Sequence, residues 1–414
     1  MISVDVATHI VQSHLLLLPE VSSGLLDSHG KVLRESLLAD RDFPPFNRVM
    51  MDGIAIRYET FASGIRVFPV EETLAAGGEA VSLTNPGHCI EVMTGAVLPE
   101  GTDTVIRYED LEFGREETPP VVKIVMDRVK HGQNVHWQGS DHLSGSVLIE
   151  KGVKIGAPEI GVAASIGKTN IQVSSQPRVA VVSTGDEIVQ VNETPLRHQI
   201  RSSNGEVLVV SLREMGIFPD RFHIGDSEAA VNQMISELLK QYEVIILSGG
   251  VSKGKFDFIP DALEKQGVVK HFHQVAQRPG KPFWFGVKGE NERIVFALPG
   301  NPVSTFVNFV RYVKPWLERS LGLPAAMPMY ATLAEPIFFG PELTFFLQVK
   351  IEAGEDGHLF AVPVKANGSG DHGSLLYGNG FLELPPERSE FLPGENYPLW
   401  LYRSLTGMAS GEMM

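Results

Sequence analysis

The sequence predicts a multidomain α/β plus β protein built around a central, doubly wound α/β domain. Its 414 residues exceed the roughly 100–200 residues of one ordinary domain. Between about residues 178 and 321, short apolar runs alternate with amphipathic stretches of helical spacing, which is typical of βαβ units with right-handed crossovers. On both sides of this region, short segments with a period of two are separated by glycine, proline and asparagine turns, which indicates β modules.

The N-terminal region is expected to begin with two helices. Apolar residues at helical spacing occur over Val4–Val11 and again over Val32–Leu38. The loop Asp40–Gly53 breaks this pattern with two prolines and an Asp-Gly turn. From about residue 54 to 135 the spacing shortens towards two, which predicts a small all-β module. Residues 136–175 mix strand and helix patterns.

The central region predicts a parallel sheet with helices on both faces. Arg178–Ser183 (RVAVVS) is a continuous apolar run of the kind found in strands covered on both faces. Glu228–Gln241 carries an apolar stripe at helical spacing. A proline-containing linker over 324–328 then leads to a second β module over 329–403 and a polar tail. The expected order in the centre is strand 178–183, helices 206–215 and 228–241, strand 244–247, helix 258–266, strand 293–297 and helix 301–321.

Composition and charge restrict the class of protein. Apolar residues make up 43% and charged residues 21%, so global disorder is excluded. No apolar run approaches the roughly 18–20 residues that span a bilayer, and the N-terminus lacks the basic region of a signal peptide. The single cysteine, Cys89, can form neither an internal disulfide nor a thiolate metal site. A cytoplasmic protein is expected.

The formal net charge of −15 creates a field that repels nucleic acids and anionic membranes. Neither partner is expected. An anionic ligand would need basic groups gathered locally against this background, so the loops that follow the predicted strands are the places to search, because open parallel sheets bind ligands at that edge.

The first such loop carries two carboxylates directly after a strand. Thr184 and Gly185 form a turn, and Asp186 and Glu187 follow. This arrangement suits binding of a cation or of the polar edge of a ligand. An equally good interpretation is that Asp186 only caps the next segment.

The second loop, Ser248–Asp257, is rich in glycine. Its Gly249, Gly250 and Ser252 offer backbone N–H groups that can approach an anion closely. The spacing nearly matches a P-loop, but Phe256 stands where a Mg²⁺-ligating serine or threonine is required. An ATP-hydrolysing P-loop is therefore disfavoured, whereas another kind of phosphate cradle is favoured, with Asp257 as a candidate cation ligand or acid/base group.

The third element joins a basic loop to a helix start. Arg278 and Lys281 lie on a segment stiffened by Pro279 and Pro282. The segment Leu298–Ser304 then opens a helix. Its expected anion-binding groups are Gly300, Asn301 as N-cap, the free N–H groups after Pro302, and Ser304. Each of these loops alone is more often structural; the third, for example, could be a capped helix beside solvated cations. Three such loops at one edge of the sheet together favour an anionic ligand.

Other patterns are weaker. His271 and His273 lie on one face of an expected strand and lack a third ligand, so solvated or core histidines are the favoured interpretation. The sequence contains no Gly-x-Ser-x-Gly elbow and no His-Glu-x-x-His helix, so serine-hydrolase and zincin activities have no motif support.

Seven segments, in this order along the chain, resemble those of the molybdopterin molybdenumtransferase family. Its members insert molybdenum into the pterin cofactor, and it includes the C-terminal domain of gephyrin. The resemblance runs from about residue 44 to 380, and although each segment alone is weak, seven in register are specific. The segments are Pro44–Gly53, Met93–Ala96, Ser183–Glu187, Ser248–Ser252, Pro279–Pro282, Leu298–Ser304 and Gly368–Gly370.

The resemblance implies an elongated homodimer of four-domain subunits. The central α/β domain would bind molybdopterin, a β domain would be inserted into the N-terminal region, and the C-terminal β module would be a β-barrel. The implied ranges are 1–43 with 136–175 for the segmented N-terminal domain, 44–135 for the inserted β domain, 176–324 for the α/β domain, 325–406 for the barrel and 407–414 for the tail.

The reaction that the resemblance implies converts adenylyl-molybdopterin and molybdate into molybdenum cofactor and AMP, with Mg²⁺ as the divalent cation. Molybdopterin adenylyltransferase is the implied upstream partner. Catalytic roles are implied for Asp186, Glu187, Asp257 and Lys281, and a metal site for Asp186, Glu187, Asp226 and Asp257. The implied substrate-binding residues are Asp52, Thr94, Asp141, Thr184, Gly249, Gly250, Ser252, Arg278, Pro282, Gly300, Asn301, Ser304 and Ser369.

Within this set, Arg278, Lys281 and Ser304 are expected to bind molybdate. Asp52, Thr94 and Asp141 match positions that the family's dimer brings to the neighbouring subunit's cleft. The chain departs from the family pattern at four positions, since lysine or arginine is common at Gln274, His136 and Gln348, and glutamate is common at Lys255. Lys253, Lys255 or Lys350 could restore the missing positive charge.

Two other functions stay open at this point. The gephyrin branch also binds receptor peptides, so a non-catalytic scaffold is one alternative, although the intact acidic residues and basic loop argue against it. A molybdopterin adenylyltransferase is the other, but such enzymes usually consist of the α/β domain alone, without flanking β regions.

Overall fold

The computed structural model describes residues 1–114, 118–251 and 258–405. It divides into two compact units, which are described separately below. One contains Met1–Arg34, Gly152–Gly156 and Asn170–Met414, and the other contains Glu35–Lys151 and Ala157–Thr169.

A six-stranded sheet with the order β16-β13-β17-β21-β20-β18 forms the centre of the first unit. Four neighbouring strands are parallel, as expected, but β20 pairs antiparallel with both of its neighbours, β21 and β18. The prediction of a parallel sheet was therefore wrong for β20, because the four residues between β20 and β21 are too few for the crossover that parallel strands need. The strands are β13 (Val179–Thr184), β16 (Asp220–Ile224), β17 (Val244–Ser248), β18 (Val269–Gln274), β20 (Pro282–Lys288) and β21 (Arg293–Leu298).

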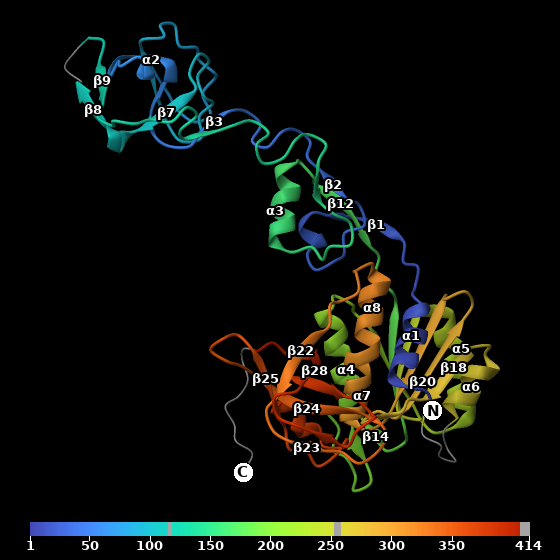
Figure 1. The fold of residues 1–414 in the computed structure, drawn as a ribbon. Helices are drawn as coiled ribbons and strands as arrows, with labels where there is room; N and C mark the ends of the chain where they lie inside the picture. Colours follow the sequence, from blue (N-terminus) through green and yellow to red (C-terminus); the bar gives the residue numbers. More distant parts are fainter. Residues whose placement is uncertain (115–117, 252–257, 406–414) are drawn as a thin grey trace. The chain divides into compact units, whose positions relative to one another are not determined.

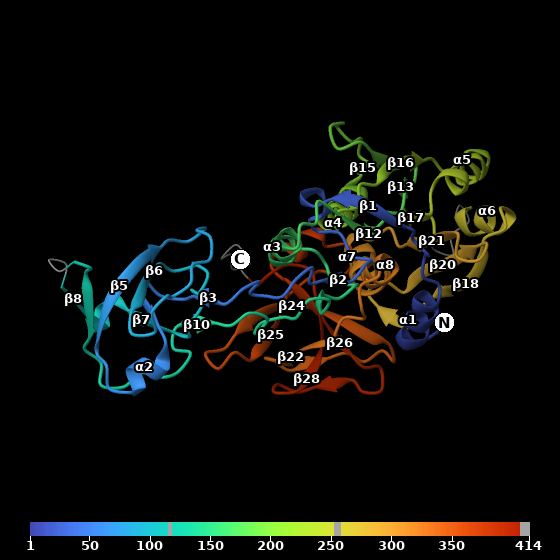
Figure 2. The ribbon, with the colours of Figure 1, turned by 90° about the horizontal axis from the view of Figure 1, so that it is seen from above.

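Helices cover both faces of this sheet, as the doubly wound prediction requires (Figures 1 and 2). Successive strand residues face opposite cores: Val179 and Val181 pack against α1, α4, α7 and α8, whereas Ala180 and Val182 pack against α5 and α6. Both faces are thus buried, which explains the continuous apolar runs. The helices are α1 (Val4–Ser13), α4 (Ser203–Glu214), α5 (Glu228–Gln241), α6 (Ile259–Lys265), α7 (Pro302–Asn308) and α8 (Lys314–Leu321).

The last two helices form one continuous helical stretch, as expected for residues 301–321. Between α7 and α8 the backbone adopts a π-helical turn, η3 (Phe309–Val313). Turns of this kind occur mostly as single insertions in α-helices, frequently at functional sites.

The C-terminal module of this unit is a closed barrel of five strands. Strand β24 pairs with both β25 and β26, so the order β24-β25-β22-β28-β26 returns to its start and leaves no free edge within the ring. A two-residue strand, β19 (Gln277–Arg278), pairs with β24 and joins the basic loop to the barrel. The strands are β22 (Met329–Leu333), β24 (Thr344–Ala353), β25 (Leu359–Pro363), β26 (Gly380–Leu384) and β28 (Asn396–Leu401).

The second helix expected near the N-terminus is absent from this described region, so that prediction was wrong. Val32 and Leu33 form isolated bridges with Lys154 and Val173, and Leu37–Leu38 is the short strand β2. Periodicity alone does not distinguish a short apolar run in a helix from one in a strand. Here the segment is extended because it pairs with residues distant in sequence.

Residues before and after the second unit are joined by strand pairing. Strand β1 (Glu20–Gly24) pairs antiparallel with β12 (Asn170–Ser174). Helix α1, in contrast, contributes Val4, Ala7 and Val11 to the core below the central sheet. The segment 1–43, expected to group with 136–175, therefore also packs on the α/β domain.

The second unit contains a six-stranded sheet with the order β7-β4-β6-β5-β9-β8. Separate apolar clusters pack on its two sides, and Cys89 is fully buried in one of them, where burial raises the pKa of its thiol to about 12. The strands of this sheet are β4 (Gly53–Ile56), β5 (Val67–Leu74), β6 (Cys89–Val92), β7 (Thr104–Arg107), β8 (Leu111–Gly114) and β9 (Val121–Ile124). Two short pairs lie outside the sheet: β3 (Arg48–Val49) pairs with β10 (Val135–His136), and β2 pairs with β11 (Val147–Ile149). The helices of the unit are α2 (Tyr58–Ala62) and α3 (Ala157–Ser165).

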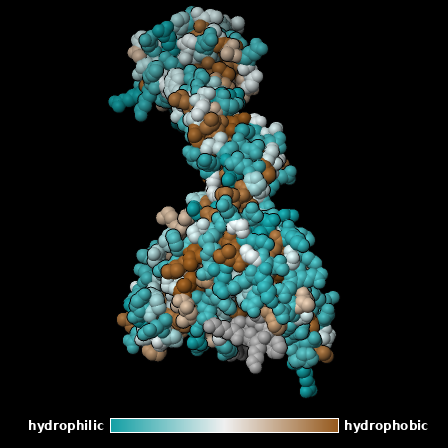
Figure 3. Space-filling view, turned by 90° about the vertical axis from the view of Figure 1, so that its right-hand side faces the viewer, coloured by the Kyte–Doolittle hydropathy of each residue, from teal (hydrophilic) through white to brown (hydrophobic). Residues whose placement is uncertain are grey.

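The surface is mainly hydrophilic on the face that Figure 3 draws, with hydrophobic residues in small patches. Across the described ranges, no helix is both long enough and apolar enough to cross a membrane.

Candidate anion-binding site

One cavity of about 1110 Å³ lies in the first unit, between the carboxyl ends of the parallel strands and the barrel. Its position is the one that an open α/β sheet favours for a ligand. The lining includes most of the expected site residues of this unit. They are Thr184, Glu187, Asp226, Gly249, Gly250, Arg278, Lys281, Pro282, Gly300, Asn301, Ser304 and Ser369.

The acidic loop follows β13 and meets the loop after β16. The backbone N–H of Asp226 donates to Asp186 Oδ1 (3.1 Å), and the N–H of Asp186 donates to Asp226 Oδ2 (3.3 Å). Glu187 and Asp226 line the cavity, whereas Asp186 does not. All three carboxylates are exposed, so the loop presents negative charge to solvent and leaves carboxylate oxygens available to a cation.

The glycine loop approaches Thr184 closely. Gly249 and Gly250 have φ values of +99° and +65°, and a Cβ added to either would lie 2.6 Å and 3.1 Å from Thr184 Oγ1. Only glycine satisfies both the conformation and the space. The predicted roles of Ser252 and Asp257 concern residues that lie outside the described ranges.

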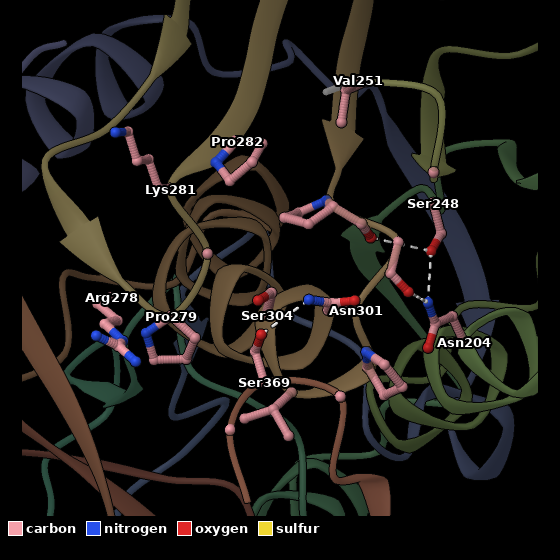
Figure 4. Close-up of a pocket in the computed structure, with 18 of the residues that line it drawn as sticks. Asn204, Ser248, Val251, Arg278, Pro279, Lys281, Pro282, Asn301, Ser304 and Ser369 are labelled. Carbon is pink, nitrogen blue, oxygen red and sulfur yellow. Dashed lines mark hydrogen bonds between the residues drawn. The ribbon is translucent and has the colours of Figure 1, made fainter. Parts of the chain in front are cut away.

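The basic loop and the start of α7 form another wall of the cavity (Figure 4). Arg278 and Lys281 are exposed and line the cavity, and the Arg278 guanidinium lies 5.9 Å from the centre of the Phe339 ring. Ser304 is 4% exposed and also lines it. Two cations and a hydroxyl on one wall form a suitable surface for an oxyanion.

Asn301 is the N-cap of α7, as predicted, and Pro302 occupies the first turn. Its side chain does not cap the helix. Instead, Asn301 Nδ2 donates to Ser369 Oγ (2.9 Å), and the N–H of Val303 donates to the carbonyl of Ser369 (3.1 Å). The helix start and the barrel loop are thus joined at the cavity, and one of the N–H groups expected to be free is occupied.

Sequence reasoning missed Asn204, which lies in the first turn of α4 and lines the cavity. Its Nδ2 donates to Ser248 Oγ (2.9 Å) and to the carbonyl of Gly300 (2.7 Å), so one amide ties together three loops (Figure 4). The polar run at the start of the helix, Ser202-Ser203-Asn204, was the available signal. It was missed because Ser and Asn before a helix ordinarily indicate only capping.

An apolar wall from the barrel side was also missed. Phe338, Phe339, Leu343 and Phe345 line the cavity, and the rings of Phe339 and Phe345 stack with centroids 4.3 Å apart. Their apolar run in the sequence is typical of strand residues, so nothing distinguished wall residues from core residues.

Comparisons with known proteins agree along the whole chain. The chain matches the models of the MoeA N-terminal region (domain I and II) over residues 2–167, a probable molybdopterin binding domain over 180–319, and the MoeA C-terminal region (domain IV) over 330–402. A molybdopterin molybdenumtransferase from Synechocystis is 38% identical over 97% of this chain and 100% of the relative. The chain belongs to the molybdopterin molybdenumtransferase family.

Further relatives support this membership. A family member from Bacillus subtilis is 30% identical over 92% of this chain and 90% of its own. The crystal structure of a molybdopterin biosynthesis MoeA protein from Pyrococcus horikosii is 28% identical, has a TM-score of 0.81 and covers 98% of this chain and 100% of that one. The predicted fold class, with its central α/β domain, inserted β domain and C-terminal barrel, is confirmed.

Three family positions lie in the second unit. Asp52 accepts hydrogen bonds from the N–H and the hydroxyl of Thr94 (2.6 and 2.7 Å), and these bonds, the backbone one first, lower the pKa of its carboxyl. His136 Nε2 lies 2.8 Å from Asp141 Oδ1, and its Nδ1 lies 3.1 Å from Arg48 Nη2. Arg48 therefore stands beside the histidine that replaces the family's common arginine.

Gln348, at a position where the resemblance implies that arginine is common, lines the cavity. The buried Gln348 donates to the carbonyl of Ser374 (2.5 Å) and accepts from the Ser374 hydroxyl (3.0 Å), so its amide is fixed as a neutral group. Lys350, considered as a replacement for the missing charge, pairs with Glu352 (2.7 Å) and does not line the cavity.

The donor chemistry of the acidic loop fits Mg²⁺, which prefers hard oxygen ligands. Among the residues that the structure describes, no three His, Cys, Asp or Glu side chains are grouped closely enough to hold an ion by themselves. Mg²⁺ is commonly bound by one or two carboxylates together with substrate phosphates, and Glu187 and Asp226 supply two carboxylates to the cavity.

Proposed function

We propose that this chain is a molybdopterin molybdenumtransferase that takes adenylyl-molybdopterin and molybdate to molybdenum cofactor and AMP. The observation that carries the proposal is that the basic loop, the acidic loop and the start of α7 line a single cavity in a chain that belongs to this family. The reaction requires two anions, a tetrahedral oxyanion and a nucleotide-linked pterin phosphate, to be held side by side.

The basic wall supplies the oxyanion site. Arg278, Lys281 and Ser304 offer two cations and a hydroxyl, which suit a molybdate dianion because charge-assisted hydrogen bonds are the strongest that side chains make. The glycine loop Ser248–Val251 lines the cavity and presents backbone to a phosphate, although the N–H of Gly249 already donates to the carbonyl of Leu298 (3.0 Å). Together these groups bring molybdate close to the phosphoanhydride of adenylyl-molybdopterin and orient it.

The acidic wall supplies the cation site. Glu187 and Asp226, with Asp186 behind them, would hold Mg²⁺, which neutralises negative charge on phosphate oxygens when it is bound. Asp186 fixes the Asp226 backbone through its Oδ1 and so orients the loop. Asp257 completes the proposed acidic set.

The test is an assay with the purified protein, adenylyl-molybdopterin, molybdate and Mg²⁺, scored by AMP release. Molybdate-dependent AMP release is expected. ATP consumption with metal-free molybdopterin would instead identify an adenylyltransferase, and binding of molybdopterin without turnover would identify a scaffold. Either result would contradict the proposal.

We also propose a cytoplasmic homodimer that receives adenylyl-molybdopterin from molybdopterin adenylyltransferase. Support comes from the family resemblance, in which Asp52, Thr94 and Asp141 serve the neighbouring subunit. Sedimentation is expected to give twice the 45.3 kDa of the single chain, and a monomer at working concentration would contradict the dimer.

A further inference from the structure

A buried network of three polar side chains lies directly behind the basic loop. Gln277 Nε2 donates to Asn308 Oδ1 (2.8 Å) and to the carbonyl of Pro279 (3.1 Å). The hydroxyl of Tyr312 donates to Gln277 Oε1 (2.5 Å). Gln277 and Asn308 are 0% exposed, and Tyr312 is 1% exposed, so solvent does not compete for these bonds.

The network holds the loop through its backbone. Asn308 Nδ2 donates to the carbonyl of Gly280 (3.1 Å), so two successive carbonyls between Arg278 and Lys281 are fixed by buried amides. A Cβ on Gly280 would lie 2.7 Å from both Asn308 Oδ1 and Gln277 Nε2. The turn therefore fits against the network with no space left between them.

Two features indicate that the network does more than fill the core. Buried amides require every donor and acceptor to be satisfied, and an apolar core of the same volume is ordinarily as stable. Tyr312 belongs to the π-helical turn η3, which begins directly after Asn308, and such turns are frequent at functional sites. Burial raises the pKa of Tyr312, so its hydroxyl keeps the proton that it donates.

We propose that Gln277, Asn308 and Tyr312 are positioning residues that set the spacing and direction of Arg278 and Lys281 and thereby determine the affinity of the cavity for a tetrahedral oxyanion. This inference rests on the proposed function for the identity of the anion. The three side chains act through the loop, and their contribution belongs to the molybdate step and not to binding of the pterin nucleotide.

The decisive variant is Tyr312→Phe, which removes one hydroxyl and leaves the ring in place. Its matched control is Tyr242→Phe, because the Tyr242 hydroxyl also donates a hydrogen bond, a part-buried one to Asp220 (2.7 Å), in the same domain but outside the cavity lining. For the full-length protein, the dissociation constant for molybdate alone is measured by calorimetry. The KM for each substrate is measured by AMP release, and the melting temperature is measured alongside.

We expect Tyr312→Phe to weaken molybdate binding, and to raise the KM for molybdate, by about tenfold, since one buried acceptor loses its donor. The KM for adenylyl-molybdopterin should stay within about twofold. Tyr242→Phe should lower the melting temperature similarly and change neither constant. Gln277→Glu, which keeps an acceptor for Tyr312 but removes both amide donors, should weaken molybdate binding further.

A Tyr312→Phe protein with unchanged molybdate affinity would overturn the inference, as would parallel rises in both KM values. If neither Tyr312→Phe nor Gln277→Glu folds, the network serves stability and the inference is also overturned. Wild-type protein that binds molybdate without releasing AMP would refute the proposed function alone. The inference could still be tested, because the dissociation constants of wild type and variants for molybdate can be compared without turnover. Wild-type protein that binds no molybdate would refute both.

Discussion

The two charged walls of the cavity are built in different ways. Behind Arg278 and Lys281, the side chains of Gln277 and Asn308 are completely buried and bond to the loop backbone. On the acidic wall, Asp186 and Asp226 are exposed, and each side chain accepts a hydrogen bond from the other residue's backbone N–H, at 3.1 and 3.3 Å. The basic wall is therefore held by the core, whereas the acidic wall is held by its own loops.

This difference indicates how the two charges are used. A loop whose shape is fixed during folding binds an anion without further loss of conformational freedom. Exposed carboxylates that lie close together repel one another, and a bound cation would offset this repulsion. We infer that the oxyanion site exists before ligands bind and that the cation site is completed by Mg²⁺ and phosphate.

The largest expected effect comes from removing a charge from the basic wall. Lys281→Met should lower kcat/KM for molybdate by about 100-fold to 1000-fold, the range seen when a donor to a developing or bound oxyanion is lost. The measurement is initial AMP release as a function of molybdate. Lys288→Met is the control, because Lys288 ends strand β20, which begins directly after Lys281, and lies outside the cavity lining. A Lys281→Met enzyme as active as this control would contradict the difference between the two walls.

A smaller effect is expected on the acidic wall. Glu187→Gln or Asp226→Asn should raise the Mg²⁺ concentration needed for half-maximal AMP release by about tenfold, because exposed charges contribute modestly. At saturating Mg²⁺ much of the rate should return. Glu193→Gln, another exposed carboxylate, is the control. A loss that Mg²⁺ cannot restore would show that this wall is as preorganised as the basic one.

Loss of the Asn204 amide, which joins the start of α4 to Ser248 and Gly300, should lower stability and cause a modest loss of rate. Asn204→Ala removes donors to Ser248 Oγ and the Gly300 carbonyl. It should lower the free energy of unfolding by about 1–3 kcal/mol and the rate by about tenfold. Asn232→Ala, which removes a similar bond to the Glu228 carbonyl on α5, should leave the rate unchanged. Chemical denaturation and AMP release measure the two effects.

The contrast between loops held by local contacts and a loop held by the distant core also explains which parts of the site the sequence could predict. The loops after β13, β17 and β21 were located because glycine, proline and charge directly after apolar runs have local causes. The Gln277–Asn308–Tyr312 network could not be predicted, since its members are 31 and 35 residues apart and each alone is an ordinary residue of a strand or helix. The strand at Leu37–Leu38 likewise depends on a partner distant in sequence, β11, whereas the antiparallel direction of β20 follows from its short connection to β21.

The smallest expected effect lies outside both walls and separates stability from activity. The ring of His271 on β18 lies against that of His14, with centroids 4.1 Å apart and a tilt of 52°. Burial, and then the positive charge of His14, lower the pKa of His271 from 6.5. The unfolded chain therefore binds this proton more readily than the folded chain, so stability is full above about pH 6.5 and declines as the pH falls through the folded-state pKa.

Melting temperatures measured from pH 8 to 5 should fall less steeply in His271→Gln than in wild type, whereas His358→Gln, at an exposed turn, should follow wild type. Because neither His14 nor His271 lines the cavity, the pH profile of AMP release should be the same in all three proteins, and a shifted profile in His271→Gln would show that the edge of the sheet is coupled to the basic wall.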